Sequence, residues 1–239
     1  MTLFVSDIHF DHAPPQGYDL LSGSREAERD LIACLRHHDP ERVVLLGDLF
    51  DAWIEYRDLI PKGLTRLLGL LAEMSDAGRE VLVCVGNHDP WHRDYMEREL
   101  GFEVLRASQV RTWHGRRVRF GHGDQEGAGG LSLWHRFIRH PWVHRLYAEV
   151  LPGSAGLSLA RRWSRALKDD LEPEAIASLR ASAQADLAAD RADLVVYGHV
   201  HHPEHSGDYI NTGSWALTRT YAMLDGQGAR LLTWEPQNS

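Results

Sequence analysis

Cysteine is scarce in this 239-residue sequence, which contains only Cys34 and Cys84. Two cysteines are too few for a disulfide-stapled scaffold or for a zinc site built from thiolates. Cys84 lies inside the apolar run VLVCVG and Cys34 lies in a helical pattern. We therefore expect both thiols to be buried and reduced.

Long hydrophobic runs are absent as well. No segment approaches the roughly 18 consecutive apolar residues of a membrane-spanning helix. The first residues, MTLFVSDIHF, have no basic start and carry Asp7 where a signal peptide requires apolar residues. These absences predict a soluble, cytosolic protein.

Positive charge is also in deficit, with 26 Lys and Arg against 34 Asp and Glu, a net charge of −8. That balance argues against a nucleic-acid partner. Hydrophobic residues make up 43% and charged residues 25%, which excludes disordered and fibrous classes. A chain of this length can bury a sizeable core, and we expect one domain over residues 1–239.

Short apolar runs alternate with helical patterns along the chain. Strands are predicted at residues 2–5, 43–46, 81–85, 118–120 and 194–197, and again over 209–234 with turns at 212–213 and 225–226. Helices are predicted from Ser24, as the N-cap, to Arg36, from Pro61 to Gly78, and over 173–190. The alternation indicates an α/β or α+β class built around a layered sheet.

A polar cluster follows each of the first five predicted strands. Four of these clusters begin with glycine, and the first begins with Ser6. The clusters are SDIH (6–9), GDLFD (47–51), GNHD (86–89), GHGD (121–124) and GHVH (198–201). Ligands collect at the carboxyl ends of strands in α/β sheets. Carboxylates and an amide mixed with imidazoles suit Mn, Fe, Zn or Ni. One such motif alone is weak evidence for a metal site. The five clusters together supply seven ligand-type side chains, which is more than one tetrahedral ion can bind. Seven ligands fit two ions that share a bridging carboxylate.

These motifs, in this order over residues 7 to 201, resemble those of the calcineurin-like metallophosphoesterase superfamily. The resemblance implies a β-sandwich flanked by helices and hydrolysis of a phosphate ester or anhydride with two divalent metal ions. Asp48 would bridge the ions. Asp7, His9 and His201 would complete the first site, and Asn87, His122 and His199 the second. His88, oriented by Asp89, would face the phosphate and protonate the leaving group.

An insertion at about residues 127–170 separates the last two motifs. Trp134, Ile138, Trp142, Leu146 and Val150 recur every four residues and predict an apolar stripe on one helical face. Pro141 and Pro152 divide the segment into short helices that could form a helical lid. Residues 131–168 also hold seven Lys and Arg against one acid. Two interpretations stay open: the stripe packs the insertion onto the domain, or it meets a membrane interface or an acyl chain.

A closer resemblance covers most of the chain, including the insertion. The blocks GDLFDAWIEYRDLIPKG and GNHDPWHRDY, with HPW and RWS inside the insertion, resemble the UDP-2,3-diacylglucosamine hydrolases of lipid A synthesis. This implies manganese-dependent cleavage of a lipid-linked nucleotide sugar to UMP and 2,3-diacylglucosamine 1-phosphate. It also implies a cytoplasmic enzyme peripheral to the inner membrane, with no obligate protein partner. The implied substrate-binding residues are Asp124, Trp134, Trp142, Arg161 and Arg162.

Two other functions stay open. The same chemistry could act on a soluble nucleotide or phosphodiester, with the insertion used for dimerisation. A non-catalytic scaffold could keep the fold and bind a partner protein. Loss of metal ligands would mark such a scaffold, and none of the seven candidates is missing from the sequence.

Overall fold

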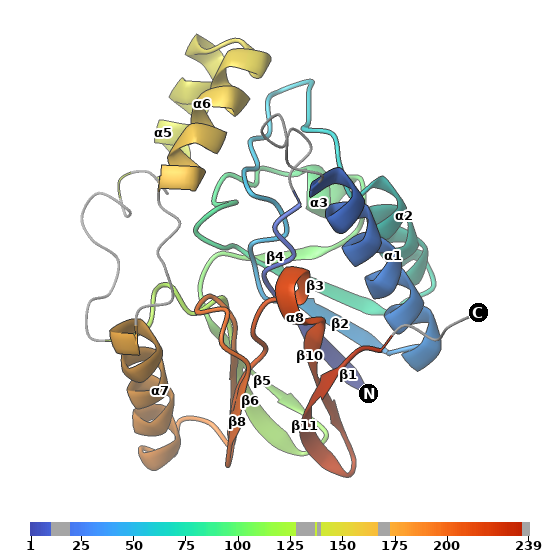
Figure 1. Cartoon of the computed structure of the whole chain (residues 1–239), viewed down its shortest axis with the longest axis vertical. Helices are drawn as coiled ribbons and strands as arrows, with labels where there is room; N and C mark the ends of the chain where they lie inside the picture. The colour runs from blue at the N-terminus through green and yellow to red at the C-terminus, as the bar shows by residue number, and fades with distance from the viewer. Residues whose placement is uncertain (11–19, 128–136, 138–139, 167–172, 236–239) are drawn as a thin grey trace.

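The computed structural model describes residues 1–10, 20–127, 137, 140–166 and 173–235 (Figure 1). Its strands form two sheets. The first contains, in spatial order, β11 (Gly228–Thr233), β10 (Thr220–Asp225), β1 (Thr2–Val5), β2 (Arg42–Leu45), β3 (Glu80–Cys84) and β4 (Glu103–Leu105). The second contains β5 (Gln109–Trp113), β6 (Arg116–Phe120), β7 (Leu194–Tyr197), β9 (Tyr209–Asn211) and β8 (Glu204–Ser206).

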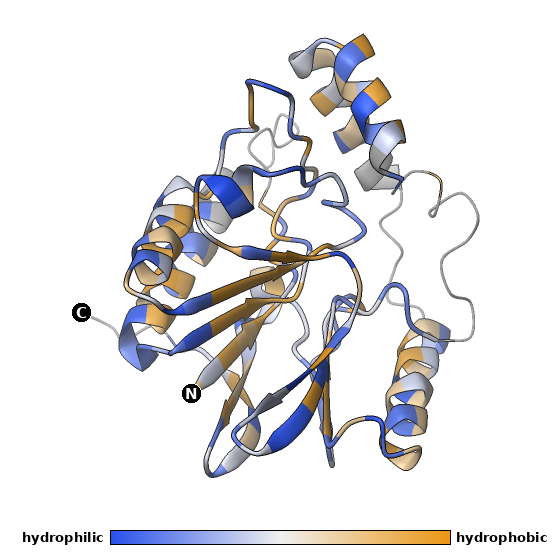
Figure 2. Ribbon diagram, turned by 180° about the vertical axis from the view of Figure 1, so that it is seen from behind, coloured by the Kyte–Doolittle hydropathy of each residue, from blue (hydrophilic) through white to orange (hydrophobic). Residues whose placement is uncertain are grey.

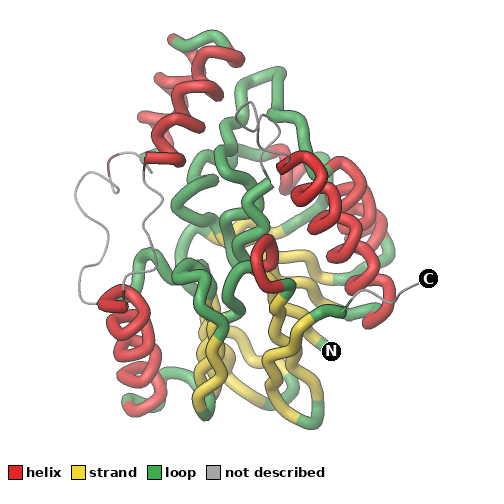
Figure 3. The backbone as a smooth tube through the Cα atoms, viewed as in Figure 1, coloured by secondary structure: helices red, strands yellow, loops and turns green. Residues whose placement is uncertain are grey.

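The strands that precede the five polar clusters run parallel within each sheet. β1, β2, β3 and β4 pair in parallel in the first sheet, and β6 pairs in parallel with β7 in the second. Val5 is in register with Leu45, and Leu45 with Val83. The strands therefore end level with one another, and the loops that follow them gather at one end of the molecule (Figure 3).

Alternation of side chains along the strands divides the core into layers. Phe4 and Val44 point between the two sheets, where they pack with Phe120 and Val196 of the second sheet. Leu3 and its neighbours on the opposite face pack under the helices α1 (Leu20–His38) and α2 (Thr65–Asp76). The outer face of the second sheet is covered by α7 (Pro173–Ala188). Figure 2 shows the hydrophobic residues concentrated along the strands. The β-sandwich flanked by helices is confirmed.

Two predicted helix starts were wrong. α1 already includes Leu20, so Ser24 lies inside the helix and not at its cap. α2 begins at Thr65 and not at Pro61, because Gly63 and Leu64 adopt positive φ angles of 140° and 47°. The Glu28 side chain of α1 is buried and accepts the N–H groups of Arg66 (3.0 Å) and Leu67 (3.1 Å). α1 thus supplies the cap of α2, a long-range contact that local sequence does not reveal.

The described part of the insertion forms two helices, α5 (Pro141–Val150) and α6 (Gly153–Ala166). α5 begins at Pro141, as predicted, and Pro152 separates it from α6. The Tyr147 hydroxyl donates a hydrogen bond of 2.7 Å to the carbonyl of Gly156 and holds the pair together. The pair stands beyond the carboxyl ends of the strands (Figure 1). Trp134 and Ile138 lie outside the described residues.

The described residues also form two single-turn helices, α3 (Tyr95–Arg98) and α8 (Trp215–Thr218). Across the described ranges, no helix combines the length and the apolar composition needed to cross a bilayer.

Candidate metal centre

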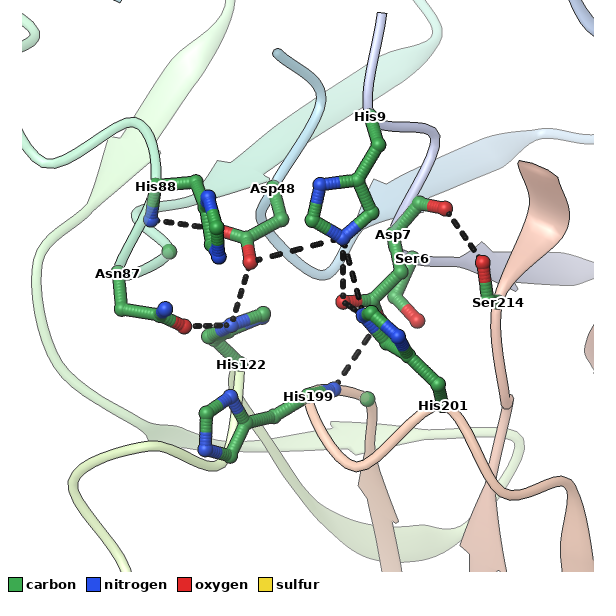
Figure 4. A network of polar contacts seen from close by, with 12 residues as sticks. Ser6, Asp7, His9, Asp48, Asn87, His88, His122, His199, His201 and Ser214 are labelled. Atoms are coloured by element: carbon green, nitrogen blue, oxygen red, sulfur yellow. Dashed lines mark hydrogen bonds and ion pairs between the residues drawn. The ribbon is translucent and has the colours of Figure 1, made fainter. Parts of the chain in front are cut away.

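All five polar clusters meet at one place, where the loops after β1, β2, β3, β6 and β7 converge (Figure 4). Each parallel strand ends just before its cluster, so the chain delivers its polar side chains to a common edge of the sandwich. The side chains brought together are Asp7, His9, Asp48, Asn87, His88, His122, His199 and His201. The structure therefore gathers all seven of the predicted ligands, and His88 with them.

Asp7, His9 and His201 form the first group. The Nε2 atoms of His9 and His201 are 2.9 Å apart. Asp7 Oδ1 lies 3.1 Å from His201 Nε2 and 3.6 Å from His9 Nε2. Two ligands at right angles around an ion about 2.1 Å away would be about 3 Å apart. The spacing of these three atoms therefore fits a divalent cation held between them.

Asn87, His122 and His199 form the second group, beside Asp48. His122 Nε2 is 2.9 Å from Asn87 Oδ1 and 3.3 Å from Asp48 Oδ2. The His199 ring lies 5.0 Å from the His122 ring, centroid to centroid. These distances repeat the spacing of the first group. The donor set of oxygens and imidazole nitrogens again suits a divalent transition metal.

The Asp48 carboxylate lies between the two groups. Its Oδ2 atom is 3.9 Å from His9 Nε2 in the first group and 3.3 Å from His122 Nε2 in the second. Asp48 and Asp7 are both almost completely buried. Buried carboxylates require a positive partner. This position is the one that a bridging ligand would occupy.

The ring nitrogens of two histidines are oriented by partners outside the groups. His9 Nδ1 lies 3.1 Å from Asp51 Oδ1, and His122 Nδ1 lies 2.8 Å from the carbonyl of Leu46. With a metal ion bound, each Nδ1–H would donate to its oxygen and the Nε2 lone pair would face the metal. Asp51 belongs to the GDLFD cluster, and no feature of that motif distinguishes its role from that of Asp48.

Several ligands have unusual backbone conformations. Asp7, His9, Asp48, His199 and His201 all have positive φ, between 47° and 71°. Residues other than glycine rarely adopt this region, and such strain gathers at functional sites. Backbone hydrogen bonds between the loops hold these conformations. Asp7 N–H donates to Gly47 O at 3.1 Å and His9 N–H donates to Asp48 O at 3.0 Å.

Glycine is also required beside Asp48. A Cβ atom added at Gly86 would lie 2.0 Å from Asp48 Oδ1. The GNHD loop can therefore approach the Asp48 carboxylate only because position 86 has no side chain.

The electrostatics of the centre favour a cation. Burial would lower the pKa of His9, but the carboxylates of Asp51 and Asp7 outweigh it and raise that pKa to about 10. Burial would also lower the pKa of His122, which Asp48 raises to about 10. Burial opposes ionisation of Asp7 and Asp48 too, yet the surrounding imidazoles hold the pKa of each carboxyl below its ordinary value. Positive charge is thus stabilised where the ligand atoms converge.

His88 lies beside the first group. Its backbone N–H donates to Asp48 Oδ1 at 2.9 Å, and its ring meets the His9 ring edge-on at 4.9 Å. Burial lowers the pKa of His88, so the imidazole is neutral at neutral pH and carries one N–H donor. This is a suitable state for donating a hydrogen bond to a phosphoryl oxygen.

The carboxylate of Asp89 makes contacts other than those expected. It accepts backbone N–H groups from Gly86 (2.9 Å), Leu49 (2.8 Å) and Asp48 (3.3 Å). These hydrogen bonds join the loops after β2 and β3. They assign Asp89 to the positioning of Asp48, whereas the sequence predicted that it would orient the His88 ring.

The predicted substrate-binding residues fall into two sets. Asp124 is partly exposed and lines a small pocket with His122, so it adjoins the centre. Trp142 on α5 and Arg162 on α6 are exposed, and Arg161 is half-buried. Trp134, already noted, is not among the described residues. Contact of any of these side chains with a substrate stays a prediction.

α5 packs against the loop after β3 through His144 and Tyr147, which lie outside the predicted apolar stripe. The His144 ring stacks on Trp91 with centroids 5.6 Å apart, and its Nε2 hydrogen-bonds the Glu55 carbonyl at 3.1 Å. Tyr147 also lies against Trp91, with ring centroids 4.8 Å apart.

The described part of the apolar stripe faces solvent. Trp142, Leu146 and Val150 are 64%, 54% and 67% exposed. The interpretation that the stripe packs the insertion onto the domain is therefore wrong for these three residues. The face that does pack carries His144 and Tyr147 instead, because their polar atoms find partners there.

Comparison with known proteins agrees with this geometry. A family model described as calcineurin-like phosphoesterase matches residues 1–203. A UDP-2,3-diacylglucosamine hydrolase from Porphyromonas gingivalis is 31% identical over 253 residues, covering 93% of each protein. One from Salmonella paratyphi B is 26% identical over 208 residues, covering 84% of this chain and 82% of that protein. Among solved structures, the phosphoesterase Yfce from E. coli covers 98% of this chain and 92% of its own, with 19% identity and a TM-score of 0.49.

Proposed function

Because this chain belongs to the calcineurin-like phosphoesterase family and is a metal-dependent hydrolase, we propose that it cleaves the pyrophosphate of UDP-2,3-diacylglucosamine. The products would be UMP and 2,3-diacylglucosamine 1-phosphate, a step of lipid A biosynthesis. The observation that carries the proposal is similarity to the Porphyromonas gingivalis hydrolase over 93% of the chain, which includes most or all of the insertion. An enzyme of the same chemistry with a soluble nucleotide or phosphodiester substrate is the alternative.

The proposed centre holds two divalent ions, with manganese as the metal. Asp7, His9 and His201 would hold one, Asn87, His122 and His199 the other, and Asp48 would contact both. Divalent ions in such a site make water more acidic and polarise phosphoryl oxygens. Asp51 and the Leu46 carbonyl would keep the Nε2 atoms of His9 and His122 directed at the ions.

His88 would act on the substrate from the edge of the centre. Its neutral imidazole can donate its proton toward the oxygen that leaves when the pyrophosphate breaks. The Asp48 carboxylate accepts the backbone N–H of His88. This hydrogen bond fixes the position of the His88 backbone relative to the ligands. The GNHD loop therefore positions the proton donor His88 and contacts the ligand Asp48 at the same time.

The exposed apolar face of α5 supports a lipid substrate. Trp142, Leu146 and Val150 present a tryptophan and two aliphatic side chains to solvent on one side of the helix. Such a face is typical of helices that lie at a membrane interface. We infer that this face contacts acyl chains, and that the enzyme associates peripherally with the cytoplasmic side of the inner membrane.

Replacing Trp142 by serine is expected to raise KM about tenfold for the diacylated substrate, because burying a tryptophan against acyl chains contributes about 1.5 kcal/mol or more. A deacylated analogue should show little change. Val110→Ser alters another exposed apolar side chain, on β5, and serves as the matched control. Equal increases of KM for both substrates would remove the α5 face from acyl-chain recognition.

The experiment that tests the function is turnover of UDP-2,3-diacylglucosamine in detergent micelles with Mn²⁺, followed by UMP release. We expect release that is lost with chelator and restored by Mn²⁺. No release of UMP, together with intact hydrolysis of an aryl phosphodiester, would keep the metal centre and reject the lipid substrate.

A further inference from the structure

An arginine-lined cavity adjoins the centre on its β4 side. The cavity, of about 470 Å³, lies between the loop after β3, the end of β4 and the anchored side of α5. Its lining contains Arg93, Arg106 and Arg145 but one acid, Asp94. We call it the arginine pocket. Its size is within the usual range for sites that hold small molecules.

The positive charge of this pocket is poorly neutralised. Among the residues that the structure describes, Arg93 and Arg106 form no ion pair with a carboxylate; Arg106 Nη2 donates instead to the carbonyls of His92 (3.3 Å) and Arg93 (3.2 Å). Asp94 pairs with Arg98 at 3.1 Å, outside the pocket lining. Guanidinium groups in this state favour an anionic ligand, such as a phosphate, that accepts several hydrogen bonds.

The arginine pocket is linked to the surroundings of the metal centre by a shared lining residue and by one hydrogen bond. Val85 lines both this pocket and the small pocket beside His122 and Asp124. The Gln125 side-chain amide, next to Asp124, donates to the Arg106 carbonyl at 3.2 Å. A ligand with one phosphate at the metal ions could therefore extend its other end among the arginines.

α5 separates this pocket from the apolar face. His144 lines the pocket from the side of the helix opposite Trp142, Leu146 and Val150, which are four residues apart, and Arg145 lines it from the border between the two sides. The insertion thus offers a cationic surface and an apolar surface on different sides of one helix. A substrate with a nucleotide at one end and acyl chains at the other has the same two chemistries.

We propose that the arginine pocket binds the nucleoside monophosphate end of the substrate. This inference rests on the proposed function and deepens it. The guanidinium groups of Arg93 and Arg106 pair with the oxygens of the phosphate and of the base, and Arg145 closes the pocket from α5.

The test is inhibition of aryl phosphodiester hydrolysis by UMP in the Mn²⁺-loaded enzyme. In the double variant Arg93→Gln/Arg106→Gln, we expect the inhibition constant of UMP to rise at least about tenfold, the scale of a lost charged hydrogen bond. Arg36→Gln, an exposed arginine on α1, is the matched control and should leave the inhibition constant unaltered.

Inorganic phosphate, used as a second inhibitor, should lose much less affinity than UMP in the same variant. An unchanged constant for UMP would overturn the proposal, and an equal rise for phosphate and UMP would overturn the nucleoside assignment. Arg145→Gln, which is exposed, repeats the test if the double variant fails to fold. Calorimetric titration of UMP into the loaded protein gives the comparison without turnover. None of these measurements needs the lipid, so failure of the lipid assignment is recognised separately.

Discussion

Replacing Asp48 by alanine is expected to abolish hydrolysis and to remove at least one metal ion. The Asp48 carboxylate lies within 4 Å of the Nε2 atoms of both His9 and His122, so its loss withdraws an oxygen from each group of ligands. It also accepts the backbone N–H of His88. The variant should therefore lose one ligand at each ion and the fixed position of the GNHD loop.

Metal content per chain, measured after dialysis by atomic emission, checks this expectation beside the activity. Asp58→Ala removes a carboxylate that is almost fully exposed, and this control should keep both activity and metal. Two ions retained by the Asp48→Ala protein would contradict the assignment of Asp48 as a bridging ligand.

His88→Ala should reduce kcat by roughly two orders of magnitude or more, which is the scale of a lost general acid, while the metal content is retained. The neutral ring lies beside the first group of ligands, whereas the hydrogen bond to Asp48 is made by the His88 backbone N–H, which alanine keeps. Removal of the ring should thus affect proton donation and leave the fold intact.

His202→Ala supplies the matched control, because His202 is an exposed histidine directly after the GHVH motif. Its turnover should equal that of the wild type. Loss of metal from the His88→Ala protein would make His88 a ligand, a role that its position near His9 and Asp48 also permits. Unchanged turnover would remove His88 from the reaction.

The ligand cluster could be predicted because its signal is local. Each ligand follows an apolar strand run within a few residues, and parallel strands bring such positions to one edge. Asp7 and His201 could therefore be expected at the same edge although 194 positions separate them, and the family resemblance placed them at the same ion. The layers of the fold were predictable for the same reason, since the strand runs Thr2–Val5 and Leu194–Tyr197 are short and uniformly apolar.

Features that depend on contacts between distant elements could not be predicted. The capping of α2 by Glu28 and the hydrogen bonds of Asp89 to loop backbone follow from packing, which the sequence pattern does not encode. The orientation of α5 could not be predicted either. Its periodicity identified an apolar and a polar face, but not which of the two faces would pack against the rest of the protein. The arginine pocket assembles side chains from three elements that have no shared motif.

The span of the ligands along the chain has a consequence for biogenesis. Asp7 is synthesised before His201, with a separation of 194 positions along the chain, yet their side chains lie 3.1 Å apart in the folded protein. Neither ion could be held by its full set of ligands until both sheets had packed together. Metal would thus enter a nearly finished fold, and the share of active molecules in a cell would follow the supply of metal after translation. Once bound, the ions would join the two sheets at their loop end and add their binding free energy to the stability of the sandwich.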